Sequence, residues 1–397
     1  MDTRQFIAEH LHDDVHELAL RTTDARVDMT LALRQIEARQ LLQKKVPSWS
    51  NNEDLLFPPH LSVEQCSSEA TARYKASLFH GDSFVDLTGG LGVDCHFISQ
   101  GFVSTDYVES NTELCSLAQH NFTTLGDPIR VHNESAEAFL QHCECYDAMF
   151  IDPARRDTAG RKVVSITDCS PNLVELQDLM MQKSRRVIVK LSPMLDISQA
   201  LKVLHGVKEV HVVAVDNECK ELLFLIASST HNPTAENQSG EDHAPLFTCV
   251  NLQSGQEPLS FTLEDEQDSP LCLASSVAQY LYEPNAALLK GGCFKLLTQR
   301  FEVQKMHRHS HLYTSETLIP NFPGRIFSVE AWAPYNKRIR QTLLADVEKA
   351  SIATRNFPLS VAELRKTLKI NDGDTIYLFA TTLSGEQKIL IKTTKVV

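Results

Sequence analysis

The sequence lacks the two features that would send a protein into a membrane or out of the cell. A membrane-spanning helix needs about 18 consecutive apolar residues, and no such run occurs in the chain. The opening MDTRQFIAEHLHDDVHELAL is acidic and amphipathic, so it has none of the basic start, apolar run and cleavage site of a secretory signal. We therefore expect a cytoplasmic protein without a membrane partner.

Paired metal-binding motifs are also missing. The ten cysteines include no CxxC pair, and the close pair Cys143 and Cys145 has the wrong spacing for a zinc knuckle. Reduced thiols that pack as small hydrophobic groups account for them. The histidines His307, His309 and His311 stand in a polar stretch without a nearby acid or thiol, which favours solvated or phosphate-facing side chains. We predict no metal.

Charge is distributed unevenly along the chain, whose formal net charge is -13. From Lys290 to Val397 there are 17 lysines and arginines against 9 aspartates and glutamates, which leaves the preceding residues strongly acidic. A basic C-terminal part attracts nucleic acid phosphates. The same excess is common on ordinary solvated surfaces, so charge alone leaves a nucleic acid partner open.

The chain exceeds the roughly 250 to 300 residues that one hydrophobic core serves, so we expect more than one domain. Apolar residues recur at helical spacing over Phe6–Leu20 and Val27–Leu42, and Ser67-Ser68-Glu69 is a typical helix start. The segment 228–244 has no large apolar residue, which predicts a linker. The predicted parts are a helical N-terminal region (1–80), a sheet domain (81–230) and a small α+β domain (245–397).

Between residue 83 and the linker, short apolar runs alternate with helical stretches, a pattern typical of βαβ units and a parallel sheet. The seven predicted strands are Phe84–Leu87, Val103–Val108, Ile129–His132, Ala148–Ile151, Arg186–Leu191, Val210–Val215 and Leu222–Ile226. The last two lie too close together for a crossover helix, so we expect an antiparallel pair.

The C-terminal part mixes both kinds of element. Leu246–Val250 and Leu259–Leu263 predict strands, Asn285–Leu289 predicts a helix, and Val361–Ile391 predicts a helix followed by two strands. Between them, a mixed aromatic and basic stretch is either a nucleic acid surface or the edge of a packed core. That stretch contains Trp332, Tyr335, Lys337, Arg338 and Arg340.

A glycine-rich turn follows the first predicted strand. Asp86 ends the strand, and Gly89, Gly90 and Gly92 lie between it and a helix, which allows close backbone approach and exposed N–H groups for a nucleotide-like ligand. The spacing cannot be aligned with the GxGxxG pattern of NAD-binding loops. An acid at the strand end also favours a positively charged ligand.

Acidic and polar residues follow the next two strands. Glu109 ends the second strand, where a carboxylate can accept hydrogen bonds from both hydroxyls of a ribose. After the third strand, Glu134-Ser135-Ala136 stands where a polar group can reach the amino group of an adenine.

The stretch VDLTGGLGVD (Val85–Asp94) resembles motif I of class I S-adenosylmethionine-dependent methyltransferases. Together with SVEQCSSEATARYKA, IDPARRD and RNFPLSVAELRKTLKINDGDTIYLFAT, it resembles bacterial methyltransferases with a THUMP-like C-terminal domain. The resemblance implies a Rossmann-like sheet of seven strands, S-adenosylmethionine as cofactor and a THUMP-like substrate-recognition domain over 245–397. The cofactor-binding residues that it implies, with those above, are Gln65, Ser68, Asp86, Thr88, Gly89, Gly90, Gly92, Asp94, Glu109, Glu134, Ser135 and Ala136.

Asp152 and Pro153 follow the fourth strand, where class I enzymes that act on exocyclic amines carry Asp/Asn-Pro-Pro-aromatic. In that motif the acid orients the amine toward the methyl group. Ala154 and Arg155 depart from the motif, and the missing aromatic removes a stacking surface for a flipped base. We nevertheless predict Asp152, Pro153 and Arg155 as catalytic residues.

Arginine at position 155 is also found in enzymes that methylate the carbon of uridine, but these need a cysteine after the fifth strand. Here that stretch is Lys190-Leu191-Ser192-Pro193, which excludes this route. Arg155 binds a phosphate or carboxylate, or pairs with the protein's own acids. Lys190 is predicted either as an active-site residue or as a strand-end lysine that extends to solvent.

The leading hypothesis is a methyltransferase that modifies a base nitrogen in structured RNA, either rRNA or tRNA. The alternatives are a small-molecule methyltransferase and a catalytically silent RNA-binding protein of the same fold. The oligomeric state, the target atom and the role of the N-terminal region do not follow from the sequence.

Overall fold

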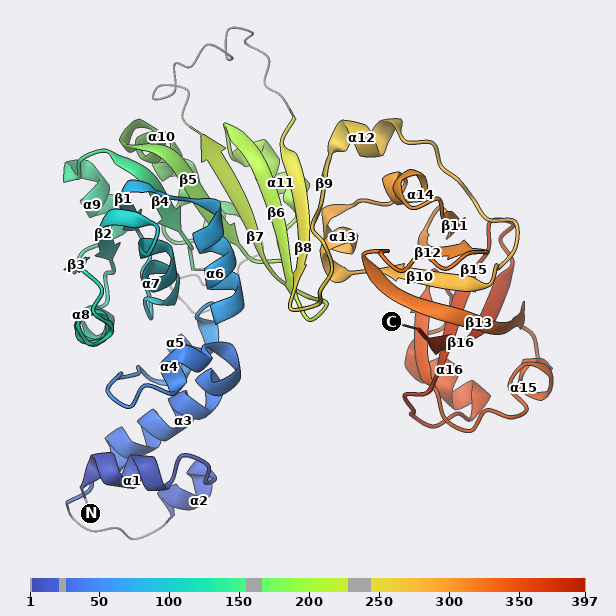
Figure 1. Ribbon diagram of the computed structural model, residues 1–397, viewed down its shortest axis with the longest axis horizontal. Coiled ribbons are helices and arrows are strands. Elements are labelled where there is room, and N and C mark those ends of the chain that lie inside the picture. The colour runs from blue at the N-terminus through green and yellow to red at the C-terminus, as the bar shows by residue number, and fades with distance from the viewer. Residues whose placement is uncertain (1, 21–25, 155–165, 228–243, 397) are drawn as a thin grey trace, which may run out of the picture. The chain divides into compact units, whose positions relative to one another are not determined.

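The computed structural model describes residues 2–20, 26–154, 166–227 and 244–396. The chain divides into two compact units (Figure 1). Unit 1 comprises residues 1–210 and 221–243, and unit 2 comprises 211–220 and 244–397. None of the described helices combines the length and the apolar character that crossing a membrane requires.

The N-terminal part of unit 1 is helical, as predicted. Its helices are α1 (Thr3–Glu9), α2 (Val15–Ala19), α3 (Met29–Lys45), α4 (Pro47–Ser50), α5 (His60–Gln65) and α6 (Glu69–Leu78). The single helix expected over Phe6–Leu20 is wrong, because Asp14 starts a new helix by accepting the backbone N–H groups of His16 and Glu17. Ser68 caps α6 through the N–H of Thr71, which confirms the predicted helix start.

A nine-stranded sheet has the order β3-β2-β1-β4-β5-β7-β6-β8-β9. Its strands are β1 (Gly81–Asp86), β2 (Phe102–Val108), β3 (Ile129–His132), β4 (Tyr146–Ile151), β5 (Ser184–Leu191), β6 (Val207–Val215), β7 (Glu218–Ala227), β8 (Leu246–Leu252) and β9 (Leu259–Thr262). All seven predicted strands are present, and β7 is antiparallel to β5. The expected seven-stranded sheet is extended by β8 and β9, which were assigned to the C-terminal domain by sequence alone.

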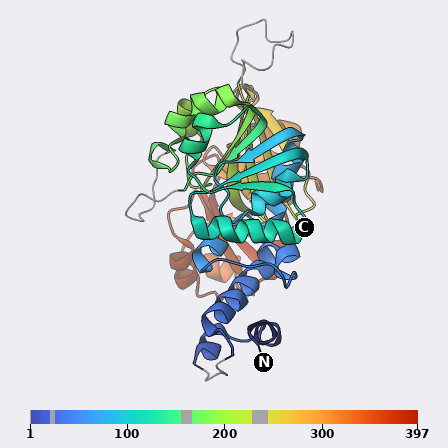
Figure 2. The same ribbon diagram turned by 90° about the vertical axis from the view of Figure 1, so that its left-hand side faces the viewer.

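Helices cover both faces of the parallel part of this sheet (Figure 2). Green α10 lies on one face and blue α6 with teal α7 on the other. Covered strands bury their side chains on both sides, which explains why β4 and β5 read as continuous apolar runs. The helices that follow the strands are α7 (Val93–Ser99), α8 (Thr112–Leu125), α9 (Ala136–His142), α10 (Leu173–Lys183) and α11 (Ile197–Val203), with a 3₁₀ turn at Ile166–Asp168.

Unit 2 contains a second, seven-stranded sheet with the order β11-β12-β10-β13-β16-β15-β14. Its strands are β10 (Tyr280–Pro284), β11 (Gln304–His307), β12 (Ser310–Ser315), β13 (Gly324–Pro334), β14 (Ser351–Arg355), β15 (Ile376–Thr382) and β16 (Lys388–Lys395). The helices of this unit are α12 (Leu263–Asp268), α13 (Ala286–Gly291), α14 (Leu296–Arg300), α15 (Ile339–Thr342) and α16 (Val361–Leu368). The predicted C-terminal order of helix, strand and strand is confirmed.

One sequence interpretation in unit 2 needs correction. His307 is buried, and its ring nitrogens contact Glu386 and Asn356, so it is not solvated. Arg340 is partly exposed, and its guanidinium donates to the backbone carbonyl of Val347 at 2.6 Å.

Arg39 fixes the chain between α4 and α5. Its guanidinium group donates hydrogen bonds of 2.8 to 3.1 Å to four backbone carbonyls, those of Ser50, Asn52, Glu53 and Leu55. The side chain of Arg39 is buried, and its bond to Leu55 lies away from water, so that carbonyl would otherwise lack a partner. The planar fork of arginine matches this arrangement, and the single ammonium of lysine does not.

We expect Arg39→Lys to lower the free energy of unfolding by about 2 kcal/mol, because buried carbonyls lose charged donors. Chemical denaturation of unit 1, followed by tryptophan fluorescence of buried Trp49, measures the change. Arg4→Lys is the control, since Arg4 forms an exposed ion pair with Asp54 and such pairs contribute only about 0 to 1 kcal/mol. Equal effects of the two changes would contradict the assigned role of Arg39.

Candidate active site

A pocket of about 820 Å³ lies at the carboxyl ends of β1, β2, β4 and β5. This is the edge of a parallel sheet where ligands bind, and the volume falls within the usual range for small-molecule sites. Segments from several elements form its walls. They are Ser62 and 64–67 in and directly after α5, 86–94 at and after the end of β1, Glu109 and Ser110 after β2, Leu114 of α8, 135–137 after β3, Phe150 and 152–154 at and after the end of β4, Ser170 and Pro171, and Lys190 on β5.

The glycine loop after β1 is shaped by contacts that only glycine permits. A Cβ atom on Gly89 would lie 2.0 Å from the ring of Tyr107, so the backbone approaches this ring too closely for any side chain. Gly92 has a φ of 87°, the left-handed region that favours glycine, and directly precedes α7. The hydroxyl of Tyr107 donates to the carbonyl of Gly90 at 2.6 Å, which holds the loop against β2.

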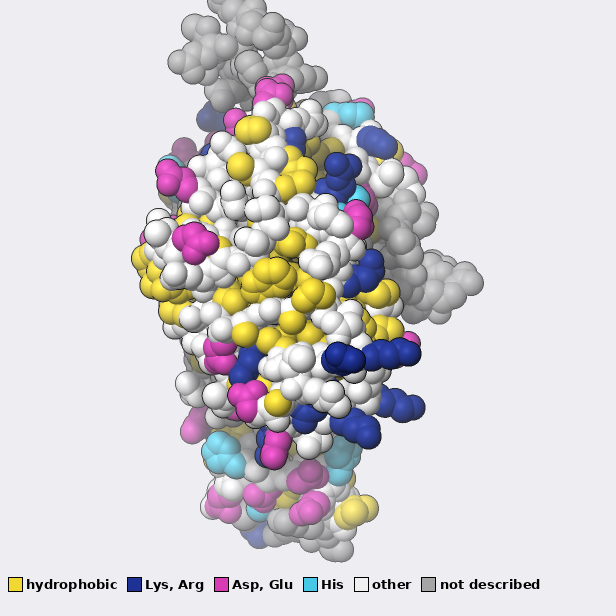
Figure 3. All heavy atoms as spheres, turned by 90° about the vertical axis from the view of Figure 1, so that its right-hand side faces the viewer, with side chains coloured by type: hydrophobic (Ala, Val, Ile, Leu, Met, Phe, Trp, Pro, Cys, Tyr) yellow, Lys and Arg dark blue, Asp and Glu magenta, His cyan; other side chains and the backbone are white. Residues whose placement is uncertain are grey.

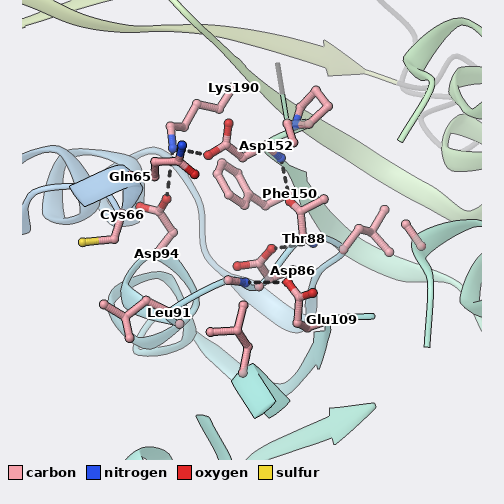
Figure 4. Close-up of a pocket in the computed structure, with 18 of the residues that line it drawn as sticks. Gln65, Cys66, Asp86, Thr88, Leu91, Asp94, Glu109, Phe150, Asp152 and Lys190 are labelled. Carbon is pink, nitrogen blue, oxygen red and sulfur yellow. Dashed lines mark hydrogen bonds and ion pairs between the residues drawn. The ribbon is translucent and has the colours of Figure 1, made fainter. Parts of the chain in front are cut away.

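Glu109 reaches over the glycine loop. Its Oε2 accepts the N–H of Gly90 at 3.1 Å, and its Oε1 accepts the N–H of Asn111 at 2.8 Å (Figure 4). A carboxylate has about four lone-pair positions, so both oxygens keep capacity to accept hydroxyl groups of a ligand. Backbone contacts therefore orient Glu109 before any ligand binds.

Asp86 is fully buried in the pocket wall. Its Oδ1 accepts the N–H of Thr88 at 3.0 Å, whereas its Oδ2 has no hydrogen-bond partner among the described residues. Burial raises the pKa of Asp86 well above its ordinary value, and the carboxylates of Asp94 and Asp152 add to this effect. An orphan carboxyl oxygen in a pocket is an acceptor for a ligand donor or a partner for a cation.

Asp152 is held by two neighbours. Its backbone N–H donates to the hydroxyl of Thr88 at 2.7 Å, which links the end of β4 to the glycine loop. Its Oδ2 pairs with the ammonium of Lys190, as Figure 4 shows. Burial alone would lower the pKa of Lys190, but the carboxylates of Asp152, Asp94 and Glu221 outweigh it and raise the pKa above its ordinary value. Lys190 therefore stays positively charged and cannot act as a base at neutral pH.

A second lysine lies behind this pair. Lys75 of α6 is completely buried, with its Nζ 2.6 and 2.8 Å from the two carboxylate oxygens of Glu221 on β7. The same Nζ lies 3.1 Å from Oδ1 of Asp94. We call Lys75, Asp94, Asp152, Lys190 and Glu221 the buried charge cluster.

Ser67 lies at the centre of the cluster. Its hydroxyl donates to Oδ2 of Asp94 at 2.6 Å and accepts hydrogen bonds from Lys190 and Lys75 at 3.2 and 3.3 Å. Burial alone would raise the pKa of Asp94, but Lys75 and Lys190 outweigh it and lower the pKa. Asp94 is therefore ionised at neutral pH.

Most of the sequence-predicted site residues line this one pocket. They are Gln65, Asp86, Thr88, Gly89, Gly90, Gly92, Asp94, Glu109, Ser135, Ala136, Asp152, Pro153 and Lys190. Ser68 does not line it, because its side chain caps α6. Glu134 does not line it either and pairs instead with His142. Arg155 lies outside the described residues.

Sequence reasoning missed Lys75 and Glu221. A lysine among the apolar positions of α6 indicates that a charged side chain is buried there. Nothing in the sequence identifies its partner, which lies 146 positions away. Cys66, which lies within the segment SVEQCSSEATARYKA, and Phe150 of β4 also line the pocket, but sequence reasoning gave neither of them a role. Among the described residues there is no group of three or more His, Cys, Asp and Glu side chains arranged to hold a metal ion.

One solved structure aligns with the whole chain. A crystal structure of a "putative methyltransferase" from Porphyromonas gingivalis W83 aligns with 100% of this chain and 98% of its own, at 32% identity and a TM-score of 0.86. The chain belongs to this methyltransferase family. The predicted resemblance to class I S-adenosylmethionine-dependent methyltransferases is confirmed at this level.

The predicted THUMP-like resemblance of the C-terminal part is confirmed as well. A ferredoxin-like domain family matches residues 280–323, and a THUMP domain-like family matches residues 324–395. No curated protein matches the sequence of this methyltransferase.

Two further solved structures align with only part of the chain. Mycoplasma capricolum TrmK in complex with S-adenosyl-homocysteine aligns with 40% of this chain and 68% of its own, at 14% identity and a TM-score of 0.32. A Pyrococcus abyssi tRNA (uracil-54, C5)-methyltransferase aligns with 44% of this chain and 41% of its own, at 17% identity and a TM-score of 0.31. At these TM-scores they add nothing to the assignment.

We expect Gly89→Ala to destabilise unit 1 by about 3 kcal/mol, because the new methyl group would force Tyr107 or the loop to move. Thermal denaturation measures the loss. Gly385→Ala is the matched control, since a Cβ at that position has no neighbour within 4 Å. A Gly89→Ala protein as stable as the control would contradict the close packing of loop and ring.

Proposed function

We propose that this methyltransferase uses S-adenosylmethionine to methylate a base nitrogen in structured RNA, either rRNA or tRNA. The observation that carries the proposal is the position of Asp152. This acid directly follows β4 and lines the same pocket as the glycine loop and Glu109, so an acceptor for a target amine lies beside the proposed cofactor site.

The pocket fits the cofactor in shape and in chemistry. When bound, S-adenosylmethionine supplies a methyl group on a positively charged sulfur. The glycine loop lines the pocket, and Glu109 is oriented to accept the ribose hydroxyls. The orphan oxygen of Asp86 suits a positively charged group. Ser135 and Ala136 lie at the adenine end that their position after β3 implies.

Lys190 and Asp152 have different roles in orienting the target amine. Because Lys190 keeps its charge, it pairs with Asp152 and fixes the direction of its carboxylate. The carboxylate accepts a hydrogen bond from a target N–H and so directs the nitrogen lone pair toward the methyl group. Transfer needs little more than this alignment in a pocket that excludes water.

Unit 2 supports RNA as the substrate through its charge. Lysine and arginine side chains gather along one side of the face in Figure 3. The exposed cations of this unit include Lys337, Arg338, Lys366 and Lys369. We propose that residues 245–397, which contain the THUMP domain-like match, recognise the RNA. Trp332 is half-buried against the core and contributes to packing more than to stacking on a base.

S-adenosylmethionine is expected to bind the wild-type protein with micromolar affinity in titration calorimetry. Asp86→Ala and Glu109→Ala should each weaken binding at least about tenfold, because each removes a charged hydrogen-bond acceptor. Glu134→Ala is the control, since Glu134 lies outside the pocket and binding should not change. No binding to the wild-type protein would refute the cofactor assignment.

Methyl transfer is measured with radiolabelled S-adenosylmethionine and RNA from cells that lack the protein. We expect label in the RNA, and a loss of about 100-fold or more in Asp152→Asn, whose neutral amide orients an amine poorly. The affinity of this variant for the cofactor should stay within about tenfold. Binding without RNA labelling would favour the alternative, a small-molecule methyltransferase.

A further inference from the structure

The buried charge cluster carries more negative than positive charge. Asp94, Asp152 and Glu221 supply three carboxylates, and Lys75 and Lys190 supply two ammonium groups. Burial raises the pKa of Glu221 above its ordinary value, and Lys75 opposes this effect by placing its ammonium within 2.8 Å of both carboxylate oxygens, the geometry of an ion pair. Counted as ionised groups, these five described side chains sum to one negative charge.

The uncompensated charge lies where water screens it weakly. Lys75 and Glu221 are 0% and 4% exposed, Asp94 and Lys190 are 10% and 13% exposed, and Asp152, at the pocket, is 35% exposed. Charges in such an environment act over longer distances than charges at a surface. Asp94, Asp152 and Lys190 also line the pocket, so the field of the cluster acts inside it.

A second, independent observation indicates a cationic ligand. Asp86 is fully buried in the wall of the same pocket, and its Oδ2 has no hydrogen-bond partner among the described residues. Figure 4 shows it between Thr88 and Glu109, on the side of the pocket opposite the pair of Lys190 and Asp152. Carboxyl groups therefore face the pocket from two sides, and a bound cation would favour the ionised form of Asp86, whose pKa burial raises well above its ordinary value.

We propose that the buried charge cluster makes the pocket select the positively charged methyl donor over its neutral product, and that Glu221 sets this selectivity from outside the pocket. The inference rests on the proposed function. S-adenosylmethionine and S-adenosylhomocysteine differ by one methyl group and one positive charge, because the bonding electron pair stays on sulfur when the methyl leaves. The same carboxylates that favour binding of the donor thus favour release of the product.

The test compares the two ligands in one protein. Titration calorimetry gives the dissociation constants of S-adenosylmethionine and S-adenosylhomocysteine, and their ratio measures the selectivity for charge. Glu221→Gln keeps the shape of the side chain and an oxygen acceptor for Lys75 but removes one negative charge. We expect the preference for S-adenosylmethionine to fall about fivefold to tenfold, while the affinity for the neutral product changes less than about twofold.

Three further variants separate charge from structure. Glu221→Asp keeps the charge, so the selectivity should stay at the wild-type value even if both affinities drop. Asp94→Asn removes a carboxylate elsewhere in the cluster and should reduce the selectivity as Glu221→Gln does. Asp106→Asn is the matched control, because Asp106 is a buried carboxylate of the same unit that pairs with Arg130 away from the pocket. Its selectivity should equal that of the wild type.

A purely structural role of Glu221 predicts a different result. Misplacement of α6 or β7 would weaken both ligands equally and leave the selectivity unchanged in every variant, which would overturn the inference. If the wild-type protein bound neither ligand, the proposed function itself would fail, and this inference with it. If the protein bound both ligands but its selectivity did not depend on the charge at positions 94 and 221, the inference would be refuted and the proposed function would stand.

Discussion

The parallel pairing of β1 with β4 is the constraint on which the site depends. Asp86 lies in register with Phe150, so the loops that leave these two strands emerge next to each other at one edge of the sheet. The hydroxyl of Thr88 then bonds the backbone of Asp152 and joins the two loops directly. A glycine loop and a candidate catalytic acid that are far apart in sequence become two walls of one pocket. Every other part of the site is arranged around this junction.

The N-terminal helices complete the pocket and do more than precede the sheet. Trp49, Leu55, Phe57 and Val63 form a core with residues of α7, which begins directly after the glycine loop. The four carbonyl bonds of Arg39 hold the chain that leads from this core to α5. As a result the segment 64–67 closes the side of the pocket that the sheet leaves open. The glycine loop is therefore supported by a region that the sheet alone would not supply.

Buried charge gives the pocket a character that its shape does not reveal. Placing ionised groups away from water is costly unless each one has partners, and Lys75 and Lys190 meet that condition for three carboxylates. Well-packed apolar side chains at positions 75 and 221 would avoid this free-energy cost, since replacing a buried ion pair by such side chains is often neutral or stabilising. Retention of the charges is consistent with a role in binding a charged ligand.

The sequence by itself determined the local structure and most of the pocket. Strand runs, the cap at Ser68 and the glycines after Asp86 depend on neighbouring residues, and short-range rules suffice to predict them. Long-range pairing decided the rest. Periodicity identifies β8 and β9 as strands, but it does not say which sheet an edge strand joins, and so the seven-stranded sheet became nine-stranded. Lys75 and Glu221 likewise pair only when β7 joins the sheet beside β5. The sequence alone does not indicate which acidic residue will neutralise a given lysine.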